Sequence, residues 1–224
     1  VQTCALPISG DTITSHSEVI GLKENSNGDN GVVYVHSTGL NQKNEAVIDY
    51  KRWVMVRKKN KSLPKIESVI PKLNSEVTKE EVIAISKDYQ FEMKNYDFTA
   101  AGSDLVFEDY KIDEKINHID GITVEEAEHM MATKLYQNNA KVHFNHFVEK
   151  GGRFGKRIVY GGHVISLTRS ISFNGLSNAF KIIAINGGTH ASPCFAGKTV
   201  FAWSKIIEKV DVSDTLGALR IRTN

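Results

Sequence analysis

The sequence contains few cysteines, little net charge and no long apolar run, and each of these shortages argues against a class of protein. Its two cysteines, Cys4 and Cys194, are too few for a disulfide framework, so we expect a reducing, cytoplasmic environment. A net charge of +2 over 224 residues gives no support for a nucleic-acid partner. No apolar stretch reaches membrane-spanning length, so we expect no membrane partner.

What remains is the composition of an ordinary globular protein. Hydrophobic residues make up 41% of the chain and charged residues 24%, and 224 residues suffice for one large or two small domains. The sequence offers no cluster of metal ligands, so we predict no metal site. Val1–Ser9 is apolar but has neither a basic start nor an initiator methionine, which argues against a signal peptide. We expect it to be either a segment foreign to the gene or a native loop.

An internal repeat divides the chain. Three pairs of segments correspond, two at one constant offset and the third with one residue of slippage: Gly10–Ile13 with Gly197–Val200, Ser17–Ile20 with Ser204–Ile207, and Gly31–Val35 with Gly217–Ile221. Each copy has the pattern of a turn, a long strand, a loop and a second strand. The repeat therefore predicts two similar subdomains.

The two copies are incomplete in opposite ways. The first continues into a further predicted strand over residues 46–56, which the second lacks because the sequence stops at Asn224. Nothing before Gly10 corresponds to the helical segment at 123–162. We therefore expect a fragment truncated at both ends. Its predicted parts are an unrelated N-terminal segment at 1–9, the back half of a first subdomain at 10–58, a linker at 59–102, and a second subdomain at 103–224 without its last strand.

The most informative segment is a predicted helix followed by a polar bend. Thr123–Glu126 has the pattern of a capping box, in which the first side chain accepts from an amide and the last reaches back. Four apolar residues then recur at helical spacing and are expected to form one buried stripe: Val124, Ala127, Met131 and Leu135. The apolar period fails over Tyr136–Asn145, where carboxamides gather with His143. This change predicts a polar pocket at the end of the helix.

Shorter patterns predict the remaining elements. Thr78–Ile85 has a similar Thr-x-x-Glu start and predicts a short helix. Four residues on one helical face predict a second long helix: Val164, Leu167, Thr168 and Ile171. Asn174–Gly175 is expected to break that helix. Strands are predicted at Ile182–Ile185 and Thr199–Lys209.

Eight strings carry a resemblance to a known family: Gly31–Ser37, Tyr50–Lys58, Asn117–Thr123, His129–Thr133, Tyr136–Asn145, Tyr160–His163, Ser172–Leu176 and Phe201–Ser204. They resemble the mesaconyl-CoA hydratases, also called β-methylmalyl-CoA dehydratases, of the MaoC-like dehydratase superfamily. Asn138 and His143 are five residues apart, the spacing of the Asp-x4-His pair in the hydratase-2 motif of that superfamily. The resemblance implies an α+β double hotdog fold, in which a long central helix is wrapped by an antiparallel sheet, twice. It also implies a homodimer of double hotdogs.

The resemblance implies reversible addition of water to an α,β-unsaturated dicarboxylic acyl-CoA, from mesaconyl-CoA to β-methylmalyl-CoA. It implies no metal and no organic cofactor, because coenzyme A enters as part of the substrate. His143 is then the expected acid/base that activates the water. Asn138 stands where the wider pattern has an aspartate. Since an amide does not accept a proton at neutral pH, we expect Asn138 to orient the water.

The resemblance also indicates candidate substrate contacts. Three residues stand at the start of the second long helix, where backbone N–H groups can hold a thioester oxygen: Gly161, Gly162 and His163. Tyr136, in the polar bend, is a further candidate. Arg169 is the first candidate for binding the free carboxylate, and Arg153 and Arg157 are candidates for the carboxylate or the coenzyme A phosphates.

Each of these assignments has a structural alternative. His143 can be a structural histidine, Asn138 a helix-capping residue, and the two glycines a tight turn. The glutamates at 125, 126 and 128 fit a helix first turn, where acids favour the helix dipole, better than a catalytic cluster. Two other functions stay open for the whole protein. One is an R-specific enoyl-CoA hydratase of the MaoC type, and the other is a non-catalytic acyl-CoA-binding hotdog fragment.

Overall fold

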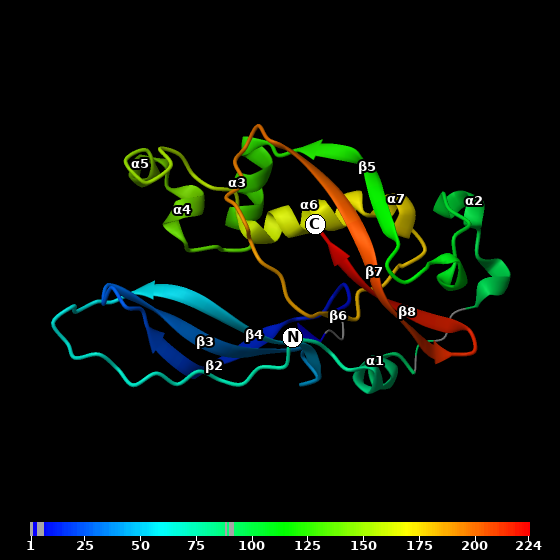
Figure 1. Ribbon diagram of the computed structural model, residues 1–224, viewed down its shortest axis with the longest axis horizontal. Coiled ribbons are helices and arrows are strands. Elements are labelled where there is room, and N and C mark those ends of the chain that lie inside the picture. The colour runs from blue at the N-terminus through cyan, green and yellow to red at the C-terminus, as the bar shows by residue number, and fades with distance from the viewer. Residues whose placement is uncertain (1, 4–6, 88, 90–91) are drawn as a thin grey trace. The chain divides into compact units, whose positions relative to one another are not determined.

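The computed structural model describes residues 2–3, 7–87, 89 and 92–224, and the chain divides into two units (Figure 1). The first unit contains the residues up to Ser86 together with Lys181–Gly188. The second contains Lys87–Phe180 and Thr189–Asn224. Both units are built on antiparallel sheets. Among the described residues, no helix has the length and apolar character needed to span a membrane.

The first unit is built on a five-stranded sheet with strand order β2-β3-β4-β1-β6. Its strands are β1 (Gln2–Thr3), β2 (Thr14–Glu24), β3 (Asn30–Leu40), β4 (Ala46–Arg57) and β6 (Ala184–Ile185). The long strands β2, β3 and β4 pair as two successive hairpins. Two backbone hydrogen bonds of 2.8 Å between Leu22 and Val69 hold the segment after β4 against β2.

Helix α1 (Lys79–Ser86) belongs to the first unit, and its start confirms the predicted Thr-x-x-Glu pattern. Thr78 Oγ1 accepts a hydrogen bond of 3.2 Å from the Glu81 amide. The Glu81 carboxylate accepts one of 2.8 Å from the Thr78 amide. Side chains thus satisfy amide groups that a helix start leaves without intrahelical partners.

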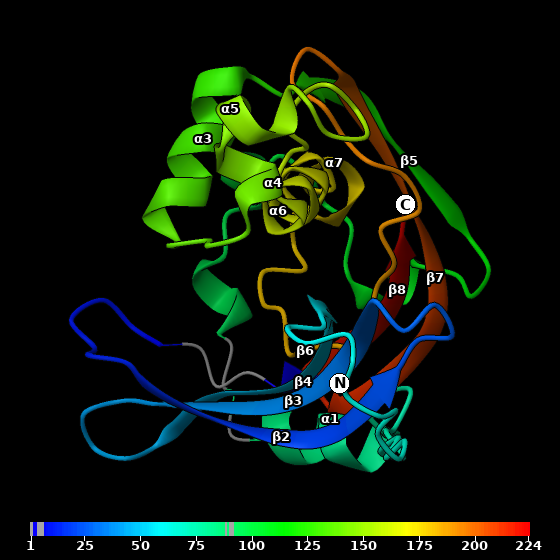
Figure 2. The same ribbon diagram turned by 90° about the vertical axis from the view of Figure 1, so that its left-hand side faces the viewer.

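The second unit is built on a three-stranded sheet that packs against helix α6 (Gly161–Ile171), which Figure 2 shows end-on. The strands, in spatial order, are β5 (Lys115–Thr123), β7 (Thr199–Ser213) and β8 (Leu216–Thr223). Short helices surround this pair of layers: η1 (Met93–Asn95), α2 (Phe98–Ala101), η2 (Phe107–Asp109), α3 (Glu126–Leu135), α4 (Lys141–Phe144), α5 (His146–Glu149) and α7 (Phe173–Leu176).

Buried apolar side chains join α6 and α7 to the sheet in two clusters: Tyr110, Leu176 and Ile206 in one, and Val124, Val159 and Leu167 in the other. Leu167 and Ile171 are the buried residues of α6, which confirms the predicted apolar face of this helix. Removing these side chains from water is the main favourable term in packing the helix on the sheet. The start of α6 is thereby fixed relative to the strands.

The internal repeat is confirmed as two hairpins, β2–β3 in the first unit and β7–β8 in the second. Both hairpins have a register shift at equivalent positions of the repeat, Ile20 in the first and Ile207 in the second, and the second hairpin has a further shift at Val212. A hydroxyl pair is repeated as well, at 2.7 and 2.8 Å: Ser17 with Ser37, and Ser204 with Thr223. The strand after the first hairpin, β4, pairs with β3, whereas β8 pairs with β7 alone among the described residues.

The predicted break after α6 is confirmed at Asn174–Gly175, where Gly175 has φ +99°. A Cβ atom at Gly175 would lie 2.6 Å from Cγ2 of Ile116, so space as well as backbone conformation requires glycine. The Tyr110 hydroxyl donates to the Gly175 carbonyl oxygen at 2.8 Å, and His118 Nδ1 donates to the Asn174 carbonyl oxygen at 2.6 Å. These contacts anchor the break to the sheet and to the loop before it.

The capping box predicted at Thr123–Glu126 is wrong. Helix α3 begins at Glu126, and its N-cap, Glu125, makes no side-chain capping bond. Thr123 is the last residue of β5, and its hydroxyl lies 2.9 Å from that of Thr199 on β7. The strand pairing continues with a 2.9 Å bond from the Val124 amide to the loop before β7. Thr123 and Val124 therefore pair with the neighbouring strand and its loop instead of forming the start of the helix.

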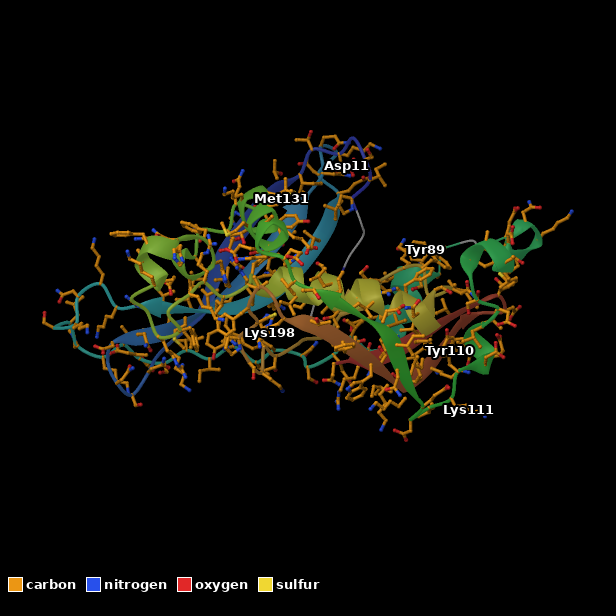
Figure 3. The ribbon with its side chains drawn as sticks, turned by 90° about the horizontal axis from the view of Figure 1, so that it is seen from above. Asp11, Tyr89, Tyr110, Lys111, Met131 and Lys198 are labelled. Carbon is orange, nitrogen blue, oxygen red and sulfur yellow. The ribbon has the colours of Figure 1, made fainter. Side chains whose placement is uncertain are left out.

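The predicted apolar stripe is also wrong for its three residues that lie in α3, although Val124, which precedes the helix, is buried. Ala127 is exposed, and Met131 and Leu135 are 68% and 70% exposed (Met131 is labelled in Figure 3). The buried residues of α3 are His129 and Thr133. The Thr133 hydroxyl donates to the His129 carbonyl oxygen at 2.7 Å, which satisfies that polar group internally. A polar stripe therefore faces the interior of the second unit.

The unit boundaries and the predicted part boundaries rest on different criteria. The unit boundary after Ser86 falls inside the predicted linker 59–102, which contains α1, η1 and α2. Strand β6, inside the range 103–224, confirms only the last two residues of the strand predicted at Ile182–Ile185, and it pairs with β1 of the first unit. The predicted parts follow sequence correspondence, and the units follow contacts, so the parts stay a prediction.

Candidate active site

A cavity of about 310 Å³ opens at the start of α6 in the second unit. Its wall comes from three stretches of chain: Ile158–Gly162 with Val164, the loop at 190–194, and His143 of α4. The first stretch leads into α6, whose register is fixed by the buried Leu167 and Ile171. The cavity thus joins a helix N-terminus, a histidine from the predicted polar bend, and a loop distant in sequence.

His143 lines this cavity, and one of its ring nitrogens is held by a backbone carbonyl. Its Nδ1 lies 3.0 Å from the carbonyl oxygen of Ile158, and because a carbonyl accepts, Nδ1 is the protonated nitrogen of the neutral ring. The Tyr160 ring stands edge-on to the imidazole, with centroids 5.9 Å apart. Nε2 is left with its lone pair, as a general base requires.

The two glycines at the start of α6 lie in close contact with side-chain rings, so an added Cβ would displace a ring. A Cβ at Gly161 would lie 2.6 Å from the His190 ring, and a Cβ at Gly162 would lie 2.6 Å from the Tyr160 ring. The N-cap, Tyr160, offers no side-chain capping bond. The first amides of a helix have no intrahelical acceptor, so this N-terminus can donate to an oxygen that gains negative charge.

Asn138 and Tyr136 lie in the bend, and neither lines the cavity. The Asn138 side-chain oxygen accepts from the Ala140 backbone amide at 2.9 Å, and the Asn138 backbone amide donates to the Thr133 carbonyl oxygen at 3.0 Å. These bonds shape the turn between α3 and α4. The Tyr136 ring is 66% exposed, and its centroid lies 6.5 Å from that of Tyr160. The structure therefore places both residues beside the cavity wall rather than in it.

His163 and Arg169 project from α6 but are also absent from the cavity lining. His163 Nε2 lies 3.6 Å from a carboxylate oxygen of Glu128 on α3. Arg169 is in the last turn of α6, where its guanidinium donates to Ser172 Oγ at 2.9 Å and to the Ala179 carbonyl at 3.0 Å. The structure thus brings together His143, Gly161 and Gly162, and leaves Arg169 at the other end of the helix.

A buried histidine supports α3 beside the site. His129 is 1% exposed, and burial lowers its pKa, with the neighbouring His163 and His143 acting in the same direction. His129 is therefore neutral at physiological pH. Within the described part of the chain, no three histidine, cysteine, aspartate or glutamate side chains are arranged to hold a metal ion.

A second cavity of about 290 Å³ lies near the first turn of α3 in the same unit. Four polar side chains line it: Glu126, His146, Lys156 and Arg157. Arg157 forms an ion pair with Glu126, and it donates to the Phe144 carbonyl oxygen at 3.3 Å. Of the three arginines considered from the sequence, Arg157 is the one that lines either of these two cavities.

Sequence reasoning missed the loop that closes the first cavity. His190, Ser192 and Cys194 all line it. Burial raises the pKa of the Cys194 thiol, so this side chain is protonated at neutral pH. The loop has no periodic pattern or motif, and the only local signal was the glycine turn before it. Its relation to His143 exists only in the folded chain.

Two curated relatives match nearly all of this chain. It is 53% identical over 221 residues to the β-methylmalyl-CoA dehydratase of Chloroflexus aurantiacus, covering 98% of this chain and 62% of that protein. It is 52% identical over 214 residues to the mesaconyl-CoA hydratase of Cereibacter sphaeroides, covering 95% of this chain and 61% of that protein. The resemblance to the MaoC-like dehydratases is confirmed. The chain spans about three fifths of the length of these relatives.

Solved structures of MaoC-like and double hotdog proteins confirm the predicted fold. A MaoC-domain dehydratase from Chloroflexus aurantiacus superposes with a TM-score of 0.93 at 52% identity, covering 99% of this chain and 63% of that one. A double hotdog protein from Mycobacterium tuberculosis superposes with a TM-score of 0.66 at 20% identity, covering 99% of this chain and 65% of that one. The second likeness concerns the fold alone. No protein-family profile matches the chain.

Proposed function

We propose that the protein containing this chain is a hydro-lyase that reversibly hydrates mesaconyl-CoA to β-methylmalyl-CoA. One observation carries the proposal. In a chain 53% identical to a β-methylmalyl-CoA dehydratase, His143 and the glycine start of α6 line the same cavity. A base and an N-terminal amide pair are the two protein groups that addition of water to an unsaturated thioester needs most.

The proposed chemistry follows from these positions. His143 Nε2 removes a proton from water while the water oxygen bonds to the β-carbon of the substrate. The electron pair of the double bond moves toward the thioester, where the amides of Gly161 and Gly162 stabilise the enolate oxygen. A proton then reaches the α-carbon. The Ile158 carbonyl holds His143 in the required tautomer throughout, since it accepts from Nδ1 at 3.0 Å.

We propose a positioning role for Asn138 in place of direct orientation of the water. Its side-chain oxygen is used by the Ala140 amide, which is the N-cap of α4, the helix that carries His143. An Asx turn of this kind fixes the direction in which the next helix leaves. Asn138 would then act on the reaction through the placement of His143.

The proposal also covers the cofactors, the cellular location and the assembly of the protein. The reaction uses no metal and no organic cofactor, because coenzyme A arrives with the substrate. We also propose that the protein acts in the cytoplasm as a homodimer of double hotdogs. We still propose three further residues as substrate contacts, at parts of the acyl-CoA beyond the reacting carbons: Tyr136, His163 and Arg169.

One observation favours a second candidate, an R-specific enoyl-CoA hydratase of the MaoC type. In the described part of the chain, none of the residues that line the cavity is an arginine or a lysine. The free carboxylate of mesaconyl-CoA calls for such a cation, whereas crotonyl-CoA does not. The two candidates therefore differ in a property that an assay measures directly.

The test compares mesaconyl-CoA with crotonyl-CoA by the loss of the conjugated thioester absorbance. The Chloroflexus aurantiacus relative serves as a positive control for the mesaconyl-CoA preparation. Our proposal expects a higher kcat/KM with mesaconyl-CoA. A higher value with crotonyl-CoA would favour the second candidate. Binding of both thioesters without any hydration would instead indicate a non-catalytic acyl-CoA-binding fragment.

A further inference from the structure

His190 shares the first cavity with His143, although the two residues are 47 positions apart in the sequence. We infer that His190 is a second acid/base group of the reaction and donates the proton that the α-carbon receives. This inference rests on the proposed hydration. It assigns a catalytic function to the loop at 190–194, for which neither the repeat nor the polar bend gave any signal.

The position of the His190 ring is set by the start of α6. A Cβ built on Gly161 would lie 2.6 Å from both Nε2 and Cε1 of His190, and 3.3 Å from Cδ2. The Nε2 edge of the ring therefore lies against the backbone at Gly161. A thioester oxygen held by the first amides of α6 would have its α-carbon two bonds away, close to this edge. The absence of a side chain at Gly161 is what permits the approach.

The His190 side chain is open to solvent at this position. Its side chain is exposed, and no described residue forms a hydrogen bond or an ion pair with either of its ring nitrogens. His143, in contrast, has one nitrogen committed to Ile158. The two imidazoles are thus complementary, one fixed in orientation and the other open to solvent.

The reaction needs a second proton-transfer group, and Asn138 does not supply it. Addition of water takes one proton from the water and delivers another to the α-carbon. The hydratase-2 pattern pairs an aspartate with a histidine, but here the amide of Asn138 cannot transfer a proton and lies outside the cavity lining. The titratable groups that do line the cavity are His143, His190, Tyr160 and Cys194. Of these, only the imidazoles ordinarily change protonation near neutral pH.

The proposed step balances as follows. His143 Nε2 takes a proton from water as the oxygen bonds to the β-carbon. The π electron pair forms the enolate, and the protonated Nε2 of His190 gives its proton to the α-carbon as the carbonyl re-forms. The substrate has gained one water, His143 has gained a proton and His190 has lost one. Proton exchange with solvent restores both rings. Hydration thus requires neutral His143 and protonated His190, and dehydration requires the reverse.

The first test compares His190→Gln with His16→Gln, a matched change at an exposed histidine on β2. We expect His190→Gln to lower kcat by on the order of 10²–10⁴, the range for losing a positioned acid or base. KM should change little, and one limb of the bell-shaped pH–rate profile should vanish. His16→Gln should leave rate and profile unchanged. A parental kcat and an intact profile in His190→Gln would overturn the inference.

A second test does not depend on turnover. Diethyl pyrocarbonate modifies accessible imidazoles, and mass spectrometry maps the modified residues with and without butyryl-CoA, a saturated thioester that cannot be hydrated. We expect butyryl-CoA to protect His143 and His190 but not His16. Protection of His143 without protection of His190 would overturn the inference. If the parental chain hydrates its substrate and the His190→Gln variant does so equally well, this inference alone is refuted. If the parental chain hydrates neither mesaconyl-CoA nor crotonyl-CoA, the proposed function is refuted first.

Discussion

The Ser204 hydroxyl lies 2.8 Å from Nε2 of His118, and both residues are buried in the sheet of the second unit. His118 Nδ1 donates to a carbonyl oxygen, so Nε2 is the acceptor and the Ser204 hydroxyl is the donor. The Thr223 hydroxyl lies 2.8 Å from Ser204 Oγ and completes a polar chain across β5, β7 and β8. The break at the end of α6 is attached to this chain through Asn174.

Replacing Ser204 with alanine tests how much the polar chain stabilises the fold. Ser204→Ala leaves a buried ring nitrogen without its donor, so we expect the free energy of unfolding to fall by roughly 1–3 kcal/mol. Ser17→Ala is the matched control, because Ser17 is the repeat equivalent of Ser204 and pairs with a serine instead of a histidine. Urea denaturation measures both. Equal losses in the two variants would contradict a special role for the His118 contact.

Substitutions of two glycines separate backbone strain from lack of space. Gly175 and Gly197 both have positive φ, +99° and +81°, but only Gly175 has an atom within reach of an added Cβ, Ile116 Cγ2 at 2.6 Å. We expect Gly197→Ala to cost about 1–3 kcal/mol from strain alone. Gly175→Ala should cost about 1–3 kcal/mol more from overpacking. Thermal or urea unfolding provides the comparison, and similar losses would show that Ile116 moves aside without cost.

The stability of the first unit should depend on the protonation of His36. Its ring lies 2.8 Å from the Asp49 carboxylate on β4 and 3.3 Å from Glu18 on β2, and the bond to Asp49 is the main cause of its raised pKa. A pKa raised in the folded state stabilises the fold fully below the unfolded value of about 6.5. That stabilisation is lost as the pH rises through the folded value.

His36→Gln removes this contribution. The difference in unfolding free energy between the parental chain and His36→Gln should be largest near pH 5.5 and should shrink as the pH rises toward 9, measured by urea denaturation across a pH series. His16→Gln, at an exposed histidine on the same hairpin, should show no such trend. A difference that stays constant with pH would mean that His36 acts by packing rather than by charge.

Variants of the polar bend should separate a reacting residue from a positioning one. His143→Ala is expected to lower kcat by on the order of 10²–10⁴ and to remove one limb of the pH–rate profile. Asn138→Ala removes the acceptor for the Ala140 amide, so we expect the free energy of unfolding to fall by about 1 kcal/mol. The limb of the pH–rate profile should persist in this variant. Asn138→Asp keeps an acceptor oxygen and should therefore keep the parental stability. A near-parental rate in His143→Ala would place the base elsewhere.

Local patterns predicted the elements that depend on neighbours in sequence. The face of α6, the break at Asn174–Gly175, the cap at Thr78 and the two equivalent hairpins all follow from spacing and turn chemistry, and the structure has each of them. The start of α3 could not be predicted in this way. There, pairing of Thr123 with a strand 76 residues further along the chain overrides a local capping signal.

The geometry of the candidate site was predictable to a similar degree, and the roles of its residues stay predictions. His143 and Gly161–Gly162 were predicted as a base and an amide pair, and the structure places them on one cavity. His190 was not predicted, because its relation to Gly161 depends on how a loop after the first unit's last strand returns to α6. The buried stripe of α3 was missed for another reason. Hydrophobicity alone does not identify a helix face whose buried members are His129 and Thr133.

The equivalent bulges at Ile20 and Ile207 have a consequence for how the chain can misfold. A bulge fixes the alternation of side chains on either side of it, so each long strand accepts its partner in only one alignment. Because both hairpins have a bulge at this equivalent point, β2 offers β8 a similar alignment near it, while the further shift at Val212 of β7 has no counterpart in β2. We therefore expect mispairing between the two copies to compete with correct pairing during folding. Sequence divergence between the copies is what distinguishes right from wrong partners, and mutations that make the hairpins more alike should slow folding even where they stabilise each hairpin.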